Sequence, residues 1–306
     1  MKRVVLLSGG VGGARLARGL AALDDIDLTI VVNVGDDETV YGLHVSPDLD
    51  TVLYTMAGVE GPEGWGLTAD TFTVMKRLSL LGTDTRFRIG DRDLATNLFR
   101  TQELLAGVGL CEVTARLAAA LSVPGRILPV TEHPVRTMVK TVDNEWLSFQ
   151  DYFVMRNHQD EVADLRFDGA ETAAPSPGVL SAIEEAEAVI IGPSNPPLSI
   201  WPILAVREIA AAVESADRVI AVSPLFGGRA LKGPADRVMA SLGLPPGNAG
   251  VIAAYGGLLS DVVIDTGDAG ERAPLSEYGP KIHVGDTRIA DPGAAWSFAD
   301  WLVDLL

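Results

Sequence analysis

The chain opens with MKRVVLLSGGVGGARLAR, residues 1–18, and this stretch sets the architecture expected for the rest. An apolar run over Val4–Leu7 leads into a glycine-rich loop over residues 8–13, after which apolar residues return at helical spacing. This order is typical of a buried strand, a tight turn and a helix. Glycines let backbone amides approach a ligand closely, and the N-terminus of a helix favours an anion. The stretch therefore predicts a phosphate-bearing ligand at the carboxyl end of the first strand.

The loop matches neither of the common nucleotide-binding fingerprints. A dinucleotide motif that starts at Gly10 needs a glycine where Arg15 stands, and a P-loop needs a lysine where Ala14 stands. A tight turn without any ligand is the alternative, but four glycines in five residues exceed what a turn needs. Arg15 in the first helical turn is unfavourable beside the helix dipole unless an anion compensates it.

The composition is that of a globular protein with a large core. The chain has 306 residues, of which 47% are hydrophobic and 21% are charged, and this length suits one large α/β domain or one and a half smaller ones. It has no apolar run of about 18 residues, so we expect no membrane span. The apolar run after Arg3 is shorter than the roughly 7–15 residues that a signal peptide needs. We therefore expect a cytoplasmic protein.

The net charge of −17 limits the classes of partner. Such acidity argues against a nucleic-acid duplex. A polyphosphate site in this chain must be locally basic, or it must use backbone amides and a divalent cation. The single cysteine, Cys111, rules out an internal disulfide and a cysteine-cluster metal site, and we expect it to be a small buried hydrophobe.

Four aspartates follow the second apolar run, LTIVVN over residues 28–33, which predicts a second strand parallel to the first. They are Asp36, Asp37, Asp48 and Asp50. In open parallel sheets, ligands bind beyond the carboxyl ends of the strands. We therefore expect these aspartates to contact a substrate or a magnesium ion, which favours one or two carboxylates together with substrate phosphates. A solvated acidic loop and a single ribose-binding acid are the alternatives.

A second polar cluster lies in GDRDLATNLFRTQ, residues 90–102. A helix that starts at Asp93 places polar residues on one face, at positions 93, 96, 97, 100 and 101. The cluster predicts a polar wall for a hydroxyl-rich ligand. A surface helix with an aspartate cap and ion pairs is the alternative.

Apolar runs that alternate with helical segments continue to the C-terminus. We predict further strands over 126–130, 188–193, 219–224, 262–266 and 281–284, a short strand over 87–89, and a closing amphipathic helix over 294–306. Ser194 and Asn195 follow one of these strands. A basic glycine loop with Gly228 and Lys232 follows the next, and it is a natural second phosphate contact.

The pattern as a whole predicts an α/β, Rossmann-like fold with a mostly parallel sheet and helices on both faces. Residues 131–177 lack the α/β alternation and contain a predicted hairpin around Asp143-Asn144. We expect them to form a smaller inserted lobe of a single domain that spans residues 1–306.

Several segments together resemble one family, CofD. They are LSGGVGGAR at 7–15, VNVGDD at 32–37, SPDLDTVLY at 46–54, GDRDLAT at 90–96, GPSNP at 192–196, and SP at 223–224 with GPAD at 233–236. They occur in the order that the family shows and span nearly the whole chain. The form GVGGAR is closer to the actinobacterial members, called FbiA, than to the archaeal ones.

The resemblance implies a phosphotransferase of the biosynthesis of coenzyme F(420), a deazaflavin hydride carrier. Such enzymes take a three-carbon acid, lactyl or enolpyruvyl, that is activated by guanosine diphosphate. They transfer its phosphate-bearing part to the terminal ribityl hydroxyl of the deazaflavin Fo, and GMP leaves. Magnesium is their usual metal. Fo and the activated acid are therefore the expected partners, and we also expect a homodimer.

The resemblance and the residue pattern together suggest roles for the candidate residues. The donor diphosphate is assigned to Gly10, Gly12, Gly13 and Arg15, and the guanosine nucleotide to Ser194, Asn195, Gly228 and Lys232. The magnesium ion is assigned to Asp37 and Asp50, with Asp36. The Fo side is assigned to Asp91, Arg92 and Thr96, together with Asp50. Asp37 and Asp50 are the catalytic candidates, and Asp50 is either a metal ligand or the acceptor of the proton of the attacking hydroxyl.

Two functions from other classes remain open. An NAD(P)-dependent dehydrogenase explains the first glycine loop, but it explains neither the aspartates nor the basic loop. A non-enzymatic nucleotide-binding regulator is the second, because a distant branch of the superfamily resembles regulators. Those members lack the PDLD run found at residues 47–50.

Overall fold

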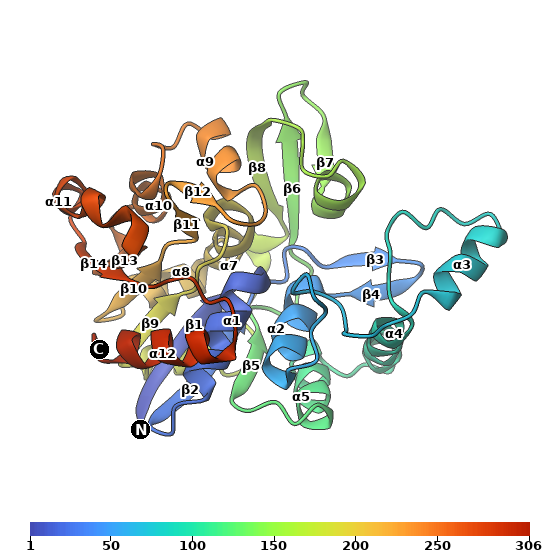
Figure 1. Cartoon of the computed structure of the whole chain (residues 1–306). Helices are drawn as coiled ribbons and strands as arrows, with labels where there is room; N and C mark the ends of the chain where they lie inside the picture. Colours follow the sequence, from blue (N-terminus) through green and yellow to red (C-terminus); the bar gives the residue numbers. More distant parts are fainter.

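The computed structural model describes all residues from 1 to 306, and a seven-stranded parallel sheet forms its centre (Figure 1). The order of the strands is β14-β13-β10-β9-β1-β2-β5. Their bounds are β1 Lys2–Ser8, β2 Ile26–Val32, β5 Arg126–Pro129, β9 Ala188–Ile191, β10 Val219–Val222, β13 Asp261–Asp265 and β14 Lys281–Gly285. The expected α/β, Rossmann-like architecture is confirmed.

The central strands are buried on both faces, as their continuous apolar sequences predict. All four residues of β9 and of β10 are buried, and β1 is buried from Val4 onward. In register, Val4 lies opposite Leu28 of β2 and Ala188 of β9. These strands contribute to one hydrophobic core of 62 buried residues.

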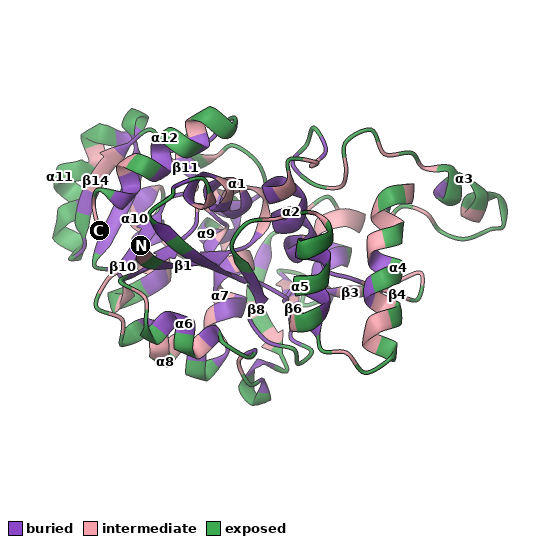
Figure 2. Cartoon of the chain, turned by 90° about the horizontal axis from the view of Figure 1, so that it is seen from below, coloured by how far each residue is buried: buried purple, intermediate pink, exposed green.

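Helices cover both faces of the sheet, and Figure 2 shows their exposed outer surfaces with the buried strands between them. On one face, α1 (Gly10–Ala21) packs between α2 (Pro47–Ala57) and α12 (Pro292–Val303). On the other face, α6 (Val179–Glu184) packs against α8 (Arg207–Glu214). The remaining helices and strands of the C-terminal half are α7 Trp201–Leu204, β11 Leu225–Phe226, β12 Arg229–Ala230, α9 Ala235–Ser241, α10 Asn248–Tyr255 and α11 Arg272–Leu275.

A separate antiparallel sheet follows β5. It consists of β6 (Arg136–Thr141), β7 (Trp146–Ser148) and β8 (Val162–Asp168), in the order β7-β6-β8. The hairpin predicted at Asp143-Asn144 joins β6 to β7, and Asn144 has the positive φ, 64°, that such a turn requires. The sequence did not predict β8, because only Val162 of its seven residues is buried and the apolar alternation is therefore weak.

The segment between β2 and β5 extends to one side of the sheet (Figure 1). It contains the hairpin β3 (Glu38–Val40) and β4 (Leu43–Val45), then α3 (Thr73–Leu80), α4 (Asp91–Leu105) and α5 (Leu110–Ala120). The prediction of a strand over 87–89 was wrong. Phe87 uses its carbonyl to accept a hydrogen bond of 2.5 Å from the Tyr41 hydroxyl, and Ile89 is buried in a small core with Val45 and Met75.

Helix α4 turns its polar face inward. Asn97 and Arg100 are buried, whereas Leu98, Phe99 and Leu105 on the other side are exposed. This arrangement inverts the usual amphipathic rule, so the polar face must find its partners inside the protein.

No single helix is long and apolar enough to cross a membrane; the bent pair Pro196–Leu204 and Arg207–Glu214 meets the criteria of length and composition only.

Candidate active site

The order of the strands reverses direction between β1 and β9, and this switch point lies at the carboxyl ends of the strands. β1 and β9 are neighbours, and the chain continues from β1 to β2 on one side and from β9 to β10 on the other. A crevice opens outside the carboxyl ends at such a switch point. The two loops that flank it touch each other, because the Ser194 hydroxyl donates a 2.7 Å hydrogen bond to the Gly9 carbonyl.

The glycines of the first loop are required by contacts within the protein. A Cβ atom on Gly12 would lie 2.1 Å from the carbonyl oxygen of Pro193, and one on Gly13 would lie 2.3 Å from the Ser8 hydroxyl. Helix α1 can therefore approach the loop after β9 only with glycine at these positions. The first amides of α1 have no acceptor within the helix. The Gly10 amide bonds to Asp48, and the amides that follow it are the groups that a ligand could use.

Ser194 and Asn195 both bond to the backbone. The Ser194 hydroxyl accepts from the Gly9 amide at 3.3 Å, in addition to its bond to the Gly9 carbonyl. The Asn195 Oδ1 accepts from the Leu198 amide at 3.2 Å and caps the following helical turn. The structure thus places both residues at the crevice, with their side chains engaged in holding the loop.

Asp48 connects the glycine loop to the aspartate cluster. Its Oδ1 accepts a 2.7 Å hydrogen bond from the Gly10 amide, and its Oδ2 accepts one of 2.9 Å from the Asn33 side chain. The same Asn33 amide donates to Asp36 Oδ1 at 3.0 Å. One continuous network therefore runs from the first turn of α1 to the loop after β2, and it places the glycine loop and the aspartates on the same edge of the sheet.

Asp37 is the acid of this cluster that has a fully buried oxygen without a hydrogen-bond partner. Its Oδ2 accepts from the Ser46 hydroxyl at 2.8 Å and lies 2.9 Å from Nε2 of His44. Its Oδ1 is buried and has no hydrogen-bond partner. A buried acceptor without a partner is costly, so this oxygen is the one most in need of a hydroxyl or a cation.

Asp50 forms a buried ion pair with Arg100 of α4. Nη1 of Arg100 lies 3.1 Å from Asp50 Oδ2, and Nη2 contacts Oδ1, so the guanidinium binds both carboxylate oxygens. The arginine itself donates to Asn97 Oδ1 at 2.8 Å. This pair therefore gives partners to the polar side chains that α4 buries, Asn97 and Arg100.

The buried acids have raised pKa values. Burial, followed by the charge of Asp48, holds the pKa of Asp36 well above its usual range. Burial raises the pKa of Asp48 to about 6, against hydrogen bonds from Asn33 and Gly10 that lower it. Burial also raises the pKa of Asp50, although the charge of Arg100 opposes it. Burial thus makes the ionised form of these acids costly, and a cation bound at the cluster would offset that cost.

The residues expected on the Fo side lie at the start of α4, in different environments. Asp91 bonds to the Thr71 hydroxyl at 2.6 Å and to the Thr73 and Val74 amides, so it caps α3. The Arg92 guanidinium is exposed and donates to the Thr68 carbonyl at 3.3 Å. Thr96 is half-buried on the inward side of the helix.

The basic residues expected near the nucleotide bond elsewhere in the protein. Nη1 of Arg15 donates to the Ile289 carbonyl at 3.1 Å. Lys232 lies 3.1 Å from the carboxylate of Glu63, and Gly228 occupies the turn between β11 and β12 with φ of 72°. A phosphate that these cations bind would have to replace the protein contacts.

The predicted site residues did not include Asn33, His44 or Ser46, which belong to this network. Asn97 and Arg100 were expected only on the polar face of a helix, and Asp48 only as one of four clustered aspartates. Asn33 and Asp48 lie inside the segments VNVGDD and SPDLDTVLY, so their position next to assigned aspartates was a signal. No sequence signal pairs Arg100 with Asp50, because 50 residues separate them.

The aspartates fit a magnesium ion only with the help of substrate oxygens. No group of three or more histidine, cysteine, aspartate or glutamate side chains in the structure has a geometry that could hold a metal ion. Asp36, Asp37 and Asp50 thus do not form a three-carboxylate site. Magnesium binds through one or two carboxylates plus substrate phosphates, and the unpartnered Asp37 Oδ1 suits that mode.

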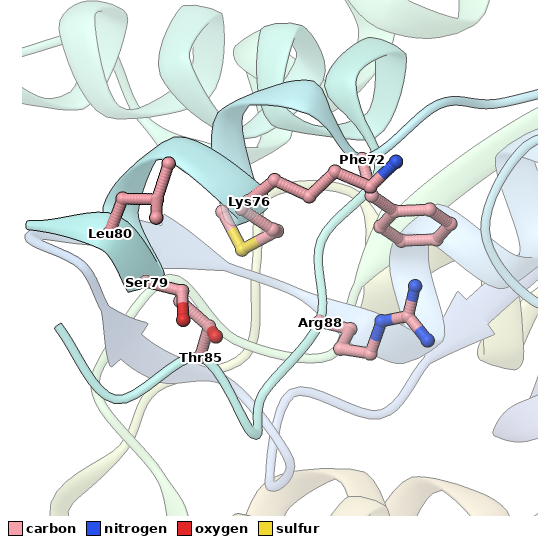
Figure 3. Close-up of a pocket in the computed structure, with 7 residues that line it drawn as sticks. Phe72, Lys76, Ser79, Leu80, Thr85 and Arg88 are labelled. Atoms are coloured by element: carbon pink, nitrogen blue, oxygen red, sulfur yellow. The ribbon is translucent and has the colours of Figure 1, made fainter. Parts of the chain in front are cut away.

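An open cavity of about 470 Å³ lies in the α3 segment, apart from this network (Figure 3). Its walls are Phe72, Met75, Lys76, Ser79, Leu80, Thr85 and Arg88. The Arg88 guanidinium lies 4.2 Å from the centre of the Phe72 ring. None of the predicted site residues lines this cavity.

The sequence resembles known proteins over nearly its whole length. The model of the family described as 2-phospho-L-lactate transferase CofD matches residues 4–285. A phosphoenolpyruvate transferase of Streptomyces griseus is 39% identical over 99% of this chain and 98% of its own. A 2-phospho-L-lactate transferase of Methanopyrus kandleri is 38% identical over 86% of this chain and 85% of its own.

A solved structure supports the fold. A protein of the UPF0052 family from Bacillus halodurans superposes with a TM-score of 0.63 over 94% of this chain and 93% of its own, at 17% sequence identity. That likeness concerns the fold alone. The family match and the identities of 38–39% over most of the length carry the assignment: the chain belongs to the CofD family of transferases.

Proposed function

We propose that the protein transfers a phosphoenolpyruvyl or 2-phospholactyl group from a guanosine-diphosphate-activated donor to the ribityl hydroxyl of the deazaflavin Fo. The hydroxyl oxygen attacks the phosphorus that carries the three-carbon acid, and the bridging P–O bond breaks. GMP leaves with the electron pair of that bond, and the hydroxyl proton passes to an acceptor. The products are GMP and coenzyme F(420)-0, or its dehydro form.

The contact between the glycine loop and the aspartate cluster carries this proposal. The Gly10 amide bonds to Asp48, which lies in the first turn of α2 together with Asp50. Transfer of a phosphoryl group needs in-line positioning and neutralisation of charge more than covalent catalysis. The later amides of the first turn of α1 and the acids at the start of α2 would supply these two requirements side by side at one diphosphate.

Magnesium is the proposed cofactor, held by Asp37 and Asp50 with the donor phosphates. When bound, it would neutralise charge that develops on the phosphate oxygens. The free Oδ1 of Asp37 supports its part in this site. Asp36 shares the Asn33 amide with Asp48, and its part would be electrostatic.

Asp50 is the proposed acceptor for the attacking hydroxyl, or a second oxygen ligand of the magnesium ion. A carboxylate oxygen has two lone-pair sites, and Arg100 occupies one on each oxygen. One site per oxygen therefore remains for a hydroxyl or a cation. Asp91, Arg92 and Thr96 would line the side from which Fo approaches.

The proposal is tested by mass spectrometry of the products formed from Fo, magnesium and each synthetic guanosine donor. We expect GMP together with F(420)-0 from the lactyl donor, or dehydro-F(420)-0 from the enolpyruvyl donor. Formation of neither product with either donor would overturn the proposal. Thermal shift assays then separate the other classes: a dehydrogenase is stabilised by a nicotinamide cofactor and not by GDP, and a nucleotide-binding regulator does not bind Fo.

A further inference from the structure

Arg100 is a buried arginine that has no role in the proposed transfer as described above. Its side chain is 1% exposed, and it comes from α4, the helix that also carries Asp91, Arg92 and Thr96. It reaches Asp50 on α2, 50 residues earlier in the chain. Arg100 therefore joins the two helices that carry the proposed Fo side and the proposed proton acceptor.

The guanidinium is held in one orientation from both sides. Its two terminal nitrogens bind the two oxygens of Asp50, and Nη1 also donates to Asn97 Oδ1 at 2.8 Å. The Asn97 amide donates in turn to the Asp93 carbonyl at 2.9 Å. Arginine presents its donors as a rigid planar fork, so two parallel contacts fix the plane of a carboxylate as well as its position.

Asp50 is the one acid of the cluster that has an arginine partner. Asp36 and Asp48 bond to Asn33, and Asp37 bonds to Ser46 and His44. A guanidinium that only balanced the charge of the cluster would serve equally well beside any of these acids. The structure places it on the residue that the proposed function needs in a defined orientation.

A purely structural ion pair is the competing explanation. Buried ion pairs contribute little net stability, because the cost of removing both charges from water offsets their attraction. A structural pair would also predict that its conservative replacement affects unfolding and leaves turnover by the folded enzyme unchanged. The two explanations therefore predict different kcat values for a conservative replacement of Arg100.

We propose that Arg100 is a positioning residue, which fixes the plane of the Asp50 carboxylate so that its remaining lone pairs meet the hydroxyl or the cation of the transfer reaction. This inference rests on the proposed function, in which Asp50 acts. Arg100 acts through Asp50 in this scheme and touches no substrate atom itself.

The test is Arg100→Lys, which keeps the positive charge but replaces the fork by a single point of contact. We expect kcat to fall at least about 10-fold, while KM for Fo and for the donor stays within about threefold, because misplacement of a reacting group lowers the rate without weakening binding. The control is Arg116→Lys on α5, an exposed arginine that pairs with Glu103 and Glu112. Its kcat should equal that of the wild type.

A crystal structure of Arg100→Lys provides a readout that does not depend on turnover. We expect the Asp50 carboxylate to rotate out of its wild-type plane, with the backbone of α2 unchanged. Wild-type kcat in the folded variant, or an Asp50 carboxylate that keeps its plane, would overturn the inference. Absence of turnover by the wild-type enzyme, measured in the same series, would instead refute the proposed function.

Asn97→Ala is the second variant, in case Arg100→Lys does not fold. It leaves the side chains of Arg100 and Asp50 intact and removes the oxygen that accepts from Nη1, together with the Asn97 amide that donates to the Asp93 carbonyl. We expect a smaller fall in kcat, about threefold to 10-fold, again with both KM values nearly unchanged. A wild-type kcat in this variant would contradict a positioning role for the Asn97–Arg100–Asp50 chain.

Discussion

Asp50 is buried against Arg100, and this pairing determines what the substitution Asp50→Asn should do. The amide keeps the shape of the side chain but cannot accept a proton or bind a cation with full charge. We expect transfer to fall by at least about 10²-fold. The substitution also leaves the Arg100 charge buried without a partner, which should lower the free energy of unfolding by about 3–5 kcal/mol.

Both effects of Asp50→Asn are measurable on the same preparation. Initial rates with saturating magnesium give the loss of transfer, and chemical denaturation followed by circular dichroism gives the loss of stability. Asp27→Asn is a suitable control, because Asp27 is exposed at the start of β2, whereas the aspartate cluster follows the end of that strand. Near-normal transfer by the Asp50→Asn variant would remove Asp50 from the mechanism.

Asp93 provides a pH-dependent contribution to stability. Burial, and then the charge of Asp50, raises its pKa to about 7. Because this exceeds the unfolded value of about 4, the folded protein binds the proton more tightly, and the stabilising effect is lost as the pH rises through about 7. We expect Asp93 to increase the free energy of unfolding by about 1 kcal/mol between about pH 8 and about pH 6.

The variant Asp93→Asn isolates this contribution. Asparagine retains an oxygen that can accept from the Tyr54 hydroxyl, which donates to Asp93 at 2.8 Å in the wild type. Denaturation curves across the same pH range should therefore show a flatter dependence for the variant. An unchanged slope would mean that other acids of the cluster, such as Asp48, account for the titration.

Among the secondary-structure elements, the approach of α1 to the loop after β9 sets the shape of the crevice. A Cβ atom on Gly12 would lie 2.1 Å from the Pro193 carbonyl oxygen, which belongs to the backbone and cannot move aside cheaply. We expect Gly12→Ala to lower the free energy of unfolding by about 1–3 kcal/mol, as overpacking does, and to reduce transfer as well.

Gly257→Ala is the matched control for Gly12→Ala. A Cβ atom on Gly257 would meet no atom within 4 Å. Urea denaturation of both variants should show a shift for Gly12→Ala and nearly none for Gly257→Ala. Equal stabilities would show that the loop after β9 relaxes away, and that the glycine is present for a ligand rather than for packing.

Across the protein, the ends of the strands opposite the crevice hold a further buried carboxylate. Asp261 begins β13 at the edge opposite the crevice, where its carboxylate lies 2.6 Å from Nε2 of His283 and 3.3 Å from Nη2 of Arg218. Burial acts to raise its pKa, but the bonds from His283 and Ser260 and the charge of Arg218 outweigh this effect and lower it. The ionised carboxylate therefore stabilises the fold.

We expect Asp261→Asn to lower the free energy of unfolding by about 2 kcal/mol and to leave kcat unchanged. Because the folded pKa of Asp261 is lowered, its contribution is present above its ordinary pKa and is lost as the pH falls through the folded value. The difference between wild type and variant should thus shrink in acid. A fall in kcat at a temperature where the variant is folded would show that this end of the sheet influences the crevice at the opposite end.

The homodimer expected from the sequence stays a prediction. Trp296 of α12 is 46% exposed, and exposed leucines lie on α3 and α4. Sedimentation velocity of the free protein measures the state directly.

The architecture and the family follow from the linear order of the residues. Apolar runs such as Val4–Leu7 and Val189–Ile191 are short, rich in β-branched residues and followed closely by glycine, which favours buried strands over helices, and the glycine loop between β1 and α1 is a local signal. The turn at Asp143-Asn144 depends on two neighbouring residues, and it was predicted for that reason. Each of these features is encoded by side chains that are close together in the chain.

The pairing of the polar residues, in contrast, depends on the three-dimensional arrangement. Folding turns the polar face of α4 inward, joins Asp50 to Arg100, and joins Asp48 to the Gly10 amide. Gly12 is required by Pro193, whereas the sequence suggested a ligand, with a tight turn as the alternative. The bonded residues are far apart in the chain, by 38 positions for Gly10 and Asp48 and by 50 for Asp50 and Arg100. Periodicity reports which face of an element is polar, but the partner of that face depends on strand order and helix packing, which no local pattern contains.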